Sequence, residues 1–186
     1  MVKQFRNLAR TAAALLFLVV SAGAGAVSPA AADDTVPLVA CTGSALQNYS
    51  PGLTLTTRST QVTSIQNYST CVDAEAGSLG GPVTSATGSV IFTTDISCLV
   101  APPVLNLQLT INWNGGRTST ADVLAVVSRT TGTTIATDTG TVTSGLFVGR
   151  TLNVTVVYPT LDIGGCLLGS GVTNINGIAT LAVLPV

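Results

Sequence analysis

The chain has 186 residues, of which only 8% are charged and 4% aromatic, and it contains no histidine. Lys and Arg number 7 and Asp and Glu number 8, which gives a formal net charge of −1. This balance excludes nucleic-acid binding, because that requires a basic surface to displace counterions. The lack of histidine excludes the Ser-His-Asp and Cys-His catalytic arrangements and most zinc and copper sites.

The first segment, residues 1–32, has the pattern of a secretory signal peptide. Three basic residues precede an apolar run over residues 11–20, and small residues follow. That run is short and is followed by glycines, which disfavours a retained membrane anchor. We expect cleavage after Ala26 or Ala32, with the second site favoured, and a single secreted, extracellular domain over residues 33–186.

A bacterial lipoprotein is the alternative, because Leu38-Val39-Ala40-Cys41 matches a lipoprotein processing site. Such a site closes the apolar region directly, whereas Asp33, Asp34 and Pro37 intervene here. A lipid on Cys41 would also leave an odd number of cysteines in an oxidising compartment. We therefore favour the ordinary signal peptide, with no membrane span once it is removed.

The mature chain would carry four arginines against eight acidic residues, a formal charge of −4. Its cysteines are even in number, which in an exported chain predicts two disulfides. Their spacing contains no Cys-x-x-Cys pair, which disfavours a zinc site. Four cysteines allow three connectivities, which the sequence leaves open, and we favour pairing between sequence neighbours. The favoured bridges are Cys41–Cys71 and Cys98–Cys166.

Thr, Val, Ser and Gly dominate the mature chain, as is typical of strands and the turns between them. Many short strands at this spacing are typical of a β-sandwich or barrel, and we expect an all-β, antiparallel, immunoglobulin-like β-sandwich of about eight strands. The expected strands are Leu53–Thr57, Gln61–Tyr68, Thr87–Ile96, Val104–Trp113, Arg117–Arg129, Thr133–Thr143, Thr151–Tyr158 and Val172–Val183.

The strongest local pattern lies in Val104–Trp113, where apolar and polar residues alternate without a break. Asn114-Gly115-Gly116 follows and predicts a β-hairpin. A two-residue turn would place Asp122 opposite the apolar stripe, whereas a three-residue loop places Ala121 and Val123 there, because a one-residue slip exchanges the faces of a strand. We favour the three-residue loop.

This register predicts that Leu107 and Leu109 are fully buried against Val123 and Ala121. Trp113 lies on the same face as the aliphatic residues, so we expect it to cap the core and not to bind sugar. The tyrosines are too scattered in sequence to suggest a binding platform. They are Tyr49, Tyr68 and Tyr158.

Asp73 and Glu75 are close in sequence and are candidates for the paired carboxylates of a glycosidase. Their setting indicates a flexible polar loop, and a charged loop is usually only solvated. We therefore expect no catalytic residue, no metal ligand, no cofactor and no enzyme activity. Asp73, Glu75 and Asp162 could also bind Ca²⁺, but they lack the regular ligand spacing of a recognisable Ca²⁺-binding loop.

Several segments resemble small, Thr/Ser-rich, four-cysteine secreted proteins of Streptomyces and related actinobacteria. They are Tyr49–Leu53, Trp113–Thr120, Gly140–Gly149 and Tyr158–Asp162 leading to Cys166. The resemblance covers nearly all of the mature chain. Because that family is uncharacterised, it implies an extracellular location and a β-sandwich but assigns no active residue.

The favoured function is therefore a non-catalytic extracellular role in binding or in the cell-surface environment, with an unknown partner or small ligand. A small-molecule carrier is one alternative, and an apolar cleft larger than packing voids would favour it. A protease inhibitor using the loop Glu75–Pro82 is another. Hydrolysis by Asp73 and Glu75 ranks last. The sequence leaves the oligomeric state open.

Overall fold

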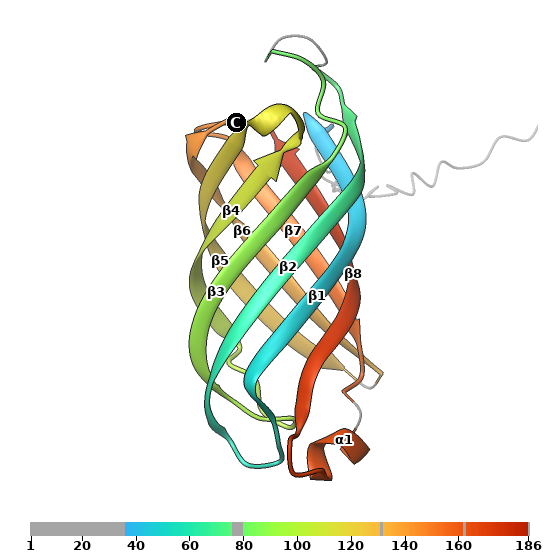
Figure 1. Cartoon of the computed structure of the whole chain (residues 1–186). Helices are drawn as coiled ribbons and strands as arrows, with labels where there is room; N and C mark the ends of the chain where they lie inside the picture. Colours follow the sequence, from blue (N-terminus) through green and yellow to red (C-terminus); the bar gives the residue numbers. More distant parts are fainter. Residues whose placement is uncertain (1–35, 76–79, 131, 162, 186) are drawn as a thin grey trace, which may run out of the picture. The chain divides into compact units, whose positions relative to one another are not determined.

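The computed structural model describes residues 36–75, 80–130, 132–161 and 163–185, so the predicted signal peptide lies outside the described residues. Eight antiparallel strands, each paired with its neighbours in sequence, form one closed sheet (Figure 1). A 3-10 turn, η1 (Asn114–Gly116), and a short helix, α1 (Ile163–Leu167), lie between strands. The strands are β1 (Val39–Leu53), β2 (Arg58–Asp73), β3 (Ala86–Ile96), β4 (Val104–Trp113), β5 (Thr118–Thr130), β6 (Thr133–Gly145), β7 (Thr151–Pro159) and β8 (Val172–Leu184).

The predicted immunoglobulin-like β-sandwich is wrong, because the sheet closes into a barrel. β8 pairs with β7 on one side and with β1 on the other, where Val39 faces Val183. A sandwich would divide these strands between two sheets with outer strands that pair on one side only, whereas here every strand pairs with a neighbour on both sides over at least part of its length. Both architectures place alternate residues inside, so the alternation that predicted the strands does not distinguish them.

Seven of the predicted strand intervals overlap observed strands, but the first, Leu53–Thr57, is wrong. The true first strand, β1, was missed because most of its inward positions are small or polar. At the bulge that follows Thr42, a Cβ on Gly43 would lie 1.9 Å from the Asn67 carbonyl oxygen, so glycine is required there. Such a strand carries little hydrophobic periodicity.

The predicted hairpin is confirmed, with the three-residue loop at η1. The Trp113 amide donates a hydrogen bond of 2.8 Å to the Arg117 carbonyl, and Leu109 pairs with Ala121. Leu109 is 1% exposed, as expected. Leu107 pairs with Val123 but is only partly buried, so the prediction of its full burial is wrong. It lines a cavity in the barrel interior instead.

An apolar cluster closes the barrel at the end that carries η1, here called the Trp113 end. Trp113 is 3% exposed, and its indole nitrogen donates a hydrogen bond of 2.8 Å to Ser119 Oγ. Its ring meets Phe147 edge to face, with 5.3 Å between the ring centroids. The predicted capping role of Trp113 is thus confirmed. A second apolar cluster, around Leu53, lies toward the other end.

Both favoured disulfides are present, and their connectivity is confirmed. Cys41 and Cys71 face each other across β1 and β2, with 4.0 Å between their Cα atoms. Cys98 and Cys166 join the β3–β4 connection to α1, with 6.3 Å between Cα atoms. Disulfides of this kind persist in oxidising compartments. In the part of the chain that the structure describes, no helix has the length and apolar character needed to cross a membrane.

Candidate functional site in the barrel interior

The barrel wall is incompletely hydrogen bonded between β3 and β4. These strands pair only where Ala86–Ser89 meets Thr110–Trp113, although β2 pairs with β3 as far as Ile96 and β5 pairs with β4 as far as Val104. Among the described residues, Val90–Ile96 and Val104–Leu109 therefore have no backbone partners on the sides that face each other. We call this stretch of the wall the seam.

The connection between β3 and β4 keeps the two strands apart at the seam. It begins with a tight turn in which the Ser97 amide donates to the Val100 carbonyl and Ser97 Oγ accepts from the Leu99 and Val100 amides. Pro102 and Pro103 follow and have no amide hydrogen to continue a ladder. The Pro103 carbonyl accepts from Val127 on β5. The connection thus joins β4 to β5 and leaves β3 free on this side.

Two adjoining cavities, each of about 50 Å³, lie in the interior beside the seam. The outer cavity reaches the end of the barrel that carries α1, the α1 end, where Arg129 and Leu161 line it. The inner cavity is lined by Ser64, Gln66 and Asp138. Since one water needs about 10–15 Å³, each cavity has room for several waters or part of a small ligand. Residues that line both are Gln47, Phe92, Leu105, Val127, Ala136 and Tyr158.

Asp138 is the buried carboxylate of the inner cavity. It is 7% exposed and pairs in the sheet with Ala125 on β5 and Val154 on β7. Burial among such neighbours raises the pKa of Asp138 to about 6, because water no longer stabilises its charged form. No donor within the described ranges hydrogen-bonds this carboxylate, which leaves its oxygens available to the cavity.

Three tyrosines on different strands approach this region from the barrel wall. Burial raises the pKa of Tyr158 to about 12, an effect that a hydrogen bond with Ser64 opposes and the charge of Asp138 reinforces. Burial, followed by Asp138 and Tyr158, also raises the pKa of Tyr68. Burial raises the pKa of Tyr49 in the same way. All three hydroxyls are therefore neutral at ordinary pH and can act as hydrogen-bond donors.

Two buried polar atoms near Asp138 are unsatisfied. Gln66 is 1% exposed, and its Nε2 donates a hydrogen bond of 2.8 Å to Ser64 Oγ. Gln66 Oε1 and the Tyr68 hydroxyl have no partner among the described residues. Gly88 makes room for the glutamine, because a Cβ there would lie 2.5 Å from Oε1. Unpaired buried polar groups are costly, and Gln66 lines the inner cavity, so that cavity is suited to a ligand or water that would satisfy Gln66 Oε1.

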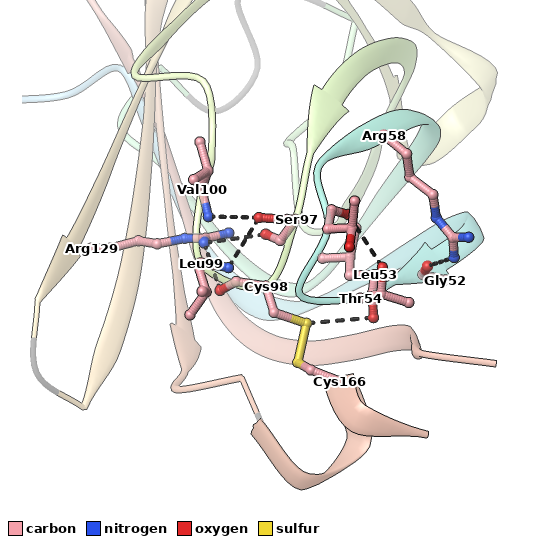
Figure 2. Close-up of a disulfide and its surroundings, with 11 residues drawn as sticks. Gly52, Leu53, Thr54, Arg58, Ser97, Cys98, Leu99, Val100, Arg129 and Cys166 are labelled. Carbon is pink, nitrogen blue, oxygen red and sulfur yellow. Dashed lines mark hydrogen bonds between the residues drawn. A yellow bond between two sulfur atoms is a disulfide. The ribbon is translucent and has the colours of Figure 1, made fainter. Parts of the chain in front are cut away.

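Arg129 lies at the α1 end of the outer cavity. Its Nη1 donates a hydrogen bond of 3.0 Å to the Cys98 carbonyl, next to the Cys98–Cys166 disulfide (Figure 2). Burial lowers the pKa of Arg129, and the neighbouring Tyr49 opposes this. Through Nη1 the guanidinium holds the β3–β4 connection against β5, whereas its buried Nε has no hydrogen-bond partner among the described residues.

The predicted carboxylate pair lies away from these cavities. Asp73 Oδ1 accepts a hydrogen bond of 2.9 Å from the Glu75 amide, and Oδ2 accepts one of 2.9 Å from the Val83 amide. Both oxygens therefore order the β2–β3 connection, and neither Asp73 nor Glu75 lines the interior. Residues 76–79 of the suggested inhibitor loop, and Asp162, lie outside the described residues.

The sequence interpretation missed the interior polar residues, although the hairpin register contains a signal for one of them. The expected register places Ala121 and Val123 inside, and the same alternation places Ala125 there too; Asp138 pairs directly with Ala125. Knowledge of the β5–β6 register would therefore have placed Asp138 inside. The tyrosines were judged too scattered to act together, and barrel closure is what brings Tyr49, Tyr68 and Tyr158 into one interior.

Within the described ranges, no group of three or more Cys, Asp and Glu residues is arranged to hold a metal ion. In comparisons with protein-family models, curated proteins and solved structures, nothing matches this chain. The resemblance to the actinobacterial secreted proteins therefore stays a prediction.

Proposed function

We propose that this protein is a secreted, non-catalytic carrier that holds a small, largely apolar molecule in its barrel interior. The observation that carries the proposal is the pair of adjoining cavities, with aliphatic and aromatic walls and a few polar atoms that have no protein partner. Such a lining is typical of small-molecule sites, in which few polar groups set the orientation of the ligand.

The seam supports access to this interior. Phe92 on β3 and Leu105 on β4 line both cavities but are only partly buried. An unpaired stretch of wall can separate further without breaking ladder hydrogen bonds, so a ligand could enter there at low cost in free energy. The fixed remainder of the barrel would then keep the polar groups in place.

Secretion is supported by the signal-peptide pattern and by the two disulfides. Many exposed residues on β4 and β6 are threonine, asparagine and glutamine, although Val104 on β4 is exposed as well. Examples are Asn106, Gln108, Thr110, Thr139 and Thr141.

The test is native mass spectrometry of the protein purified from culture medium, followed by organic extraction. We expect a bound small molecule that survives purification. Ala136→Trp should displace it, because Ala136 lines both cavities. Thr137→Trp, at the next position of the same strand, is the matched control and should retain it. A wild-type protein that carries nothing and binds no member of an apolar ligand panel would refute the proposal.

A further inference from the structure

Asp138 is the one buried carboxylate among the residues that the structure describes. On the same strand, β6, Thr134 lines the outer cavity, and Asp138 lies four residues, or about 13 Å, further along the strand. Tyr68 and Tyr158 face it from β2 and β7, and its sheet neighbours on β5 and β7 are Ala125 and Val154. The carboxylate is therefore surrounded by neutral groups.

No arginine in the described part of the chain pairs with Asp138. Arg129 donates to the Cys98 carbonyl, and Arg58 Nη2 donates to the Gly52 carbonyl. Arg117 donates to the Gly81 and Pro82 carbonyls near the Trp113 end. A buried carboxylate without a cation or a hydrogen-bond donor is unfavourable unless something else supplies one. The inner cavity lies directly against Asp138, so a bound molecule can supply it.

The other groups of the inner cavity have the chemistry that suits a protonated amine. Gln66 Oε1 has no partner and can accept a hydrogen bond, as can the Tyr158 oxygen. The rings of Tyr158 and Phe92 line the same cavity, and aromatic faces attract cations. An ammonium group has three donors, which suits the carboxylate of Asp138 and the unpaired Gln66 Oε1, both of which are acceptors.

We propose that the ligand is a small primary amine with an apolar tail, whose ammonium group binds Asp138 in the inner cavity. This inference rests on the proposed carrier function. The tail would extend through the outer cavity between Phe92, Leu105 and Val127, which line both cavities. The carboxylate would then distinguish the amine from an alcohol or acid of the same length.

The test is calorimetric titration of the secreted protein at pH 7.5 with n-hexylamine, 1-hexanol and hexanoate. We expect the amine to bind at least about tenfold more tightly than the alcohol, the ratio that corresponds to one pKa unit of differential interaction. Asp138→Asn should abolish this preference but retain alcohol binding. Asp122→Asn is the matched control, because Asp122 is an exposed carboxylate on the neighbouring strand β5.

A measurement on the wild type covers the case in which Asp138→Asn fails to fold. The ¹³C chemical shift of the Asp138 carboxyl should show that hexylamine lowers its pKa and that hexanol does not. Equal binding of amine and alcohol, or tightest binding of hexanoate, would overturn the amine inference and leave the carrier proposal standing. If none of the three binds and no molecule co-purifies, both proposals fail.

Discussion

Leu109 on β4 packs inside the barrel directly across from Ala121 on β5, in the register set by the three-residue loop at η1. The large side chain faces a small one, so Leu109 fills space that Ala121 leaves open.

Truncation of Leu109 to Ala should therefore lower the free energy of unfolding by about 2–5 kcal/mol, through lost burial and an unfilled cavity. Thr110→Ala is the control on the exposed face and should change it by less than about 0.5 kcal/mol. Urea denaturation followed by circular dichroism measures both. Similar losses in the two variants would mean that the outer face of β4 is covered.

Removal of the Asp138 charge should change how stability depends on pH. Its folded pKa is about 6 and its ordinary value is 3.8, so the folded state binds the proton more tightly. As pH rises from about 4 to 6, wild-type stability should fall relative to Asp138→Asn, by up to roughly 3 kcal/mol. Below pH 3.8, the ordinary pKa, the stabilities of the wild type and Asp138→Asn should change with pH in parallel.

Urea titrations of both proteins at pH 4 and pH 7.5 measure this effect. Asp122→Asn, which changes an exposed carboxylate on β5, is the matched control variant. An unchanged difference between wild type and Asp138→Asn across this range would show that the carboxylate is stabilised in the folded state by a partner.

The unpaired seam should be visible as fast amide hydrogen exchange. Alternate amides of Val90–Ile96 and Val104–Leu109 point toward the seam and should exchange quickly, whereas the intervening amides bond to β2 or β5 and should exchange slowly. Nuclear magnetic resonance resolves this alternation residue by residue. Uniform protection along both strands would mean that the barrel wall closes in solution.

Loss of the Cys98–Cys166 disulfide should lower the free energy of unfolding by about 2–4 kcal/mol. This bridge encloses a sequence separation of 68, against 30 for Cys41–Cys71, so the chain-entropy model gives it roughly 0.7 kcal/mol more effect. Paired Cys→Ala variants of each bridge, compared by denaturation, test the order. The reverse order would indicate that the Cys41–Cys71 bridge acts mainly through the folded state.

The sequence predicted what local patterns determine, namely the strands with strong alternation and the hairpin register. The favoured disulfide pairing is confirmed, but the sequence left the three connectivities open. It missed what depends on closure. β1 has too few large apolar residues to be recognised, yet it is the strand that closes the barrel with β8. Asp138 and Gln66 are polar residues within Thr/Ser-rich strands, and only the register shows that they face inward.

The predicted full burial of Leu107 was also wrong because it depends on a neighbouring strand. Its position in an unbroken alternating run predicted full burial, which assumes a partner strand on both sides of β4. Alternation reports which face of a strand is apolar, but it carries no information about how far a neighbouring strand follows. The early end of the β3–β4 ladder, and the cavity beside it, were therefore outside the reach of the pattern.

The pairing of Val39 with Val183 brings the first and last strands together at the Trp113 end. A short linker between them could join the chain into a circle, and new termini could then be opened in the turn between β1 and β2 at Thr54–Thr57. A reporter domain fused after β8 would be held away from α1 and the outer cavity. Tethering the protein to a surface through the end of β8 would thus leave the α1 end, with the outer cavity, facing the surrounding solution.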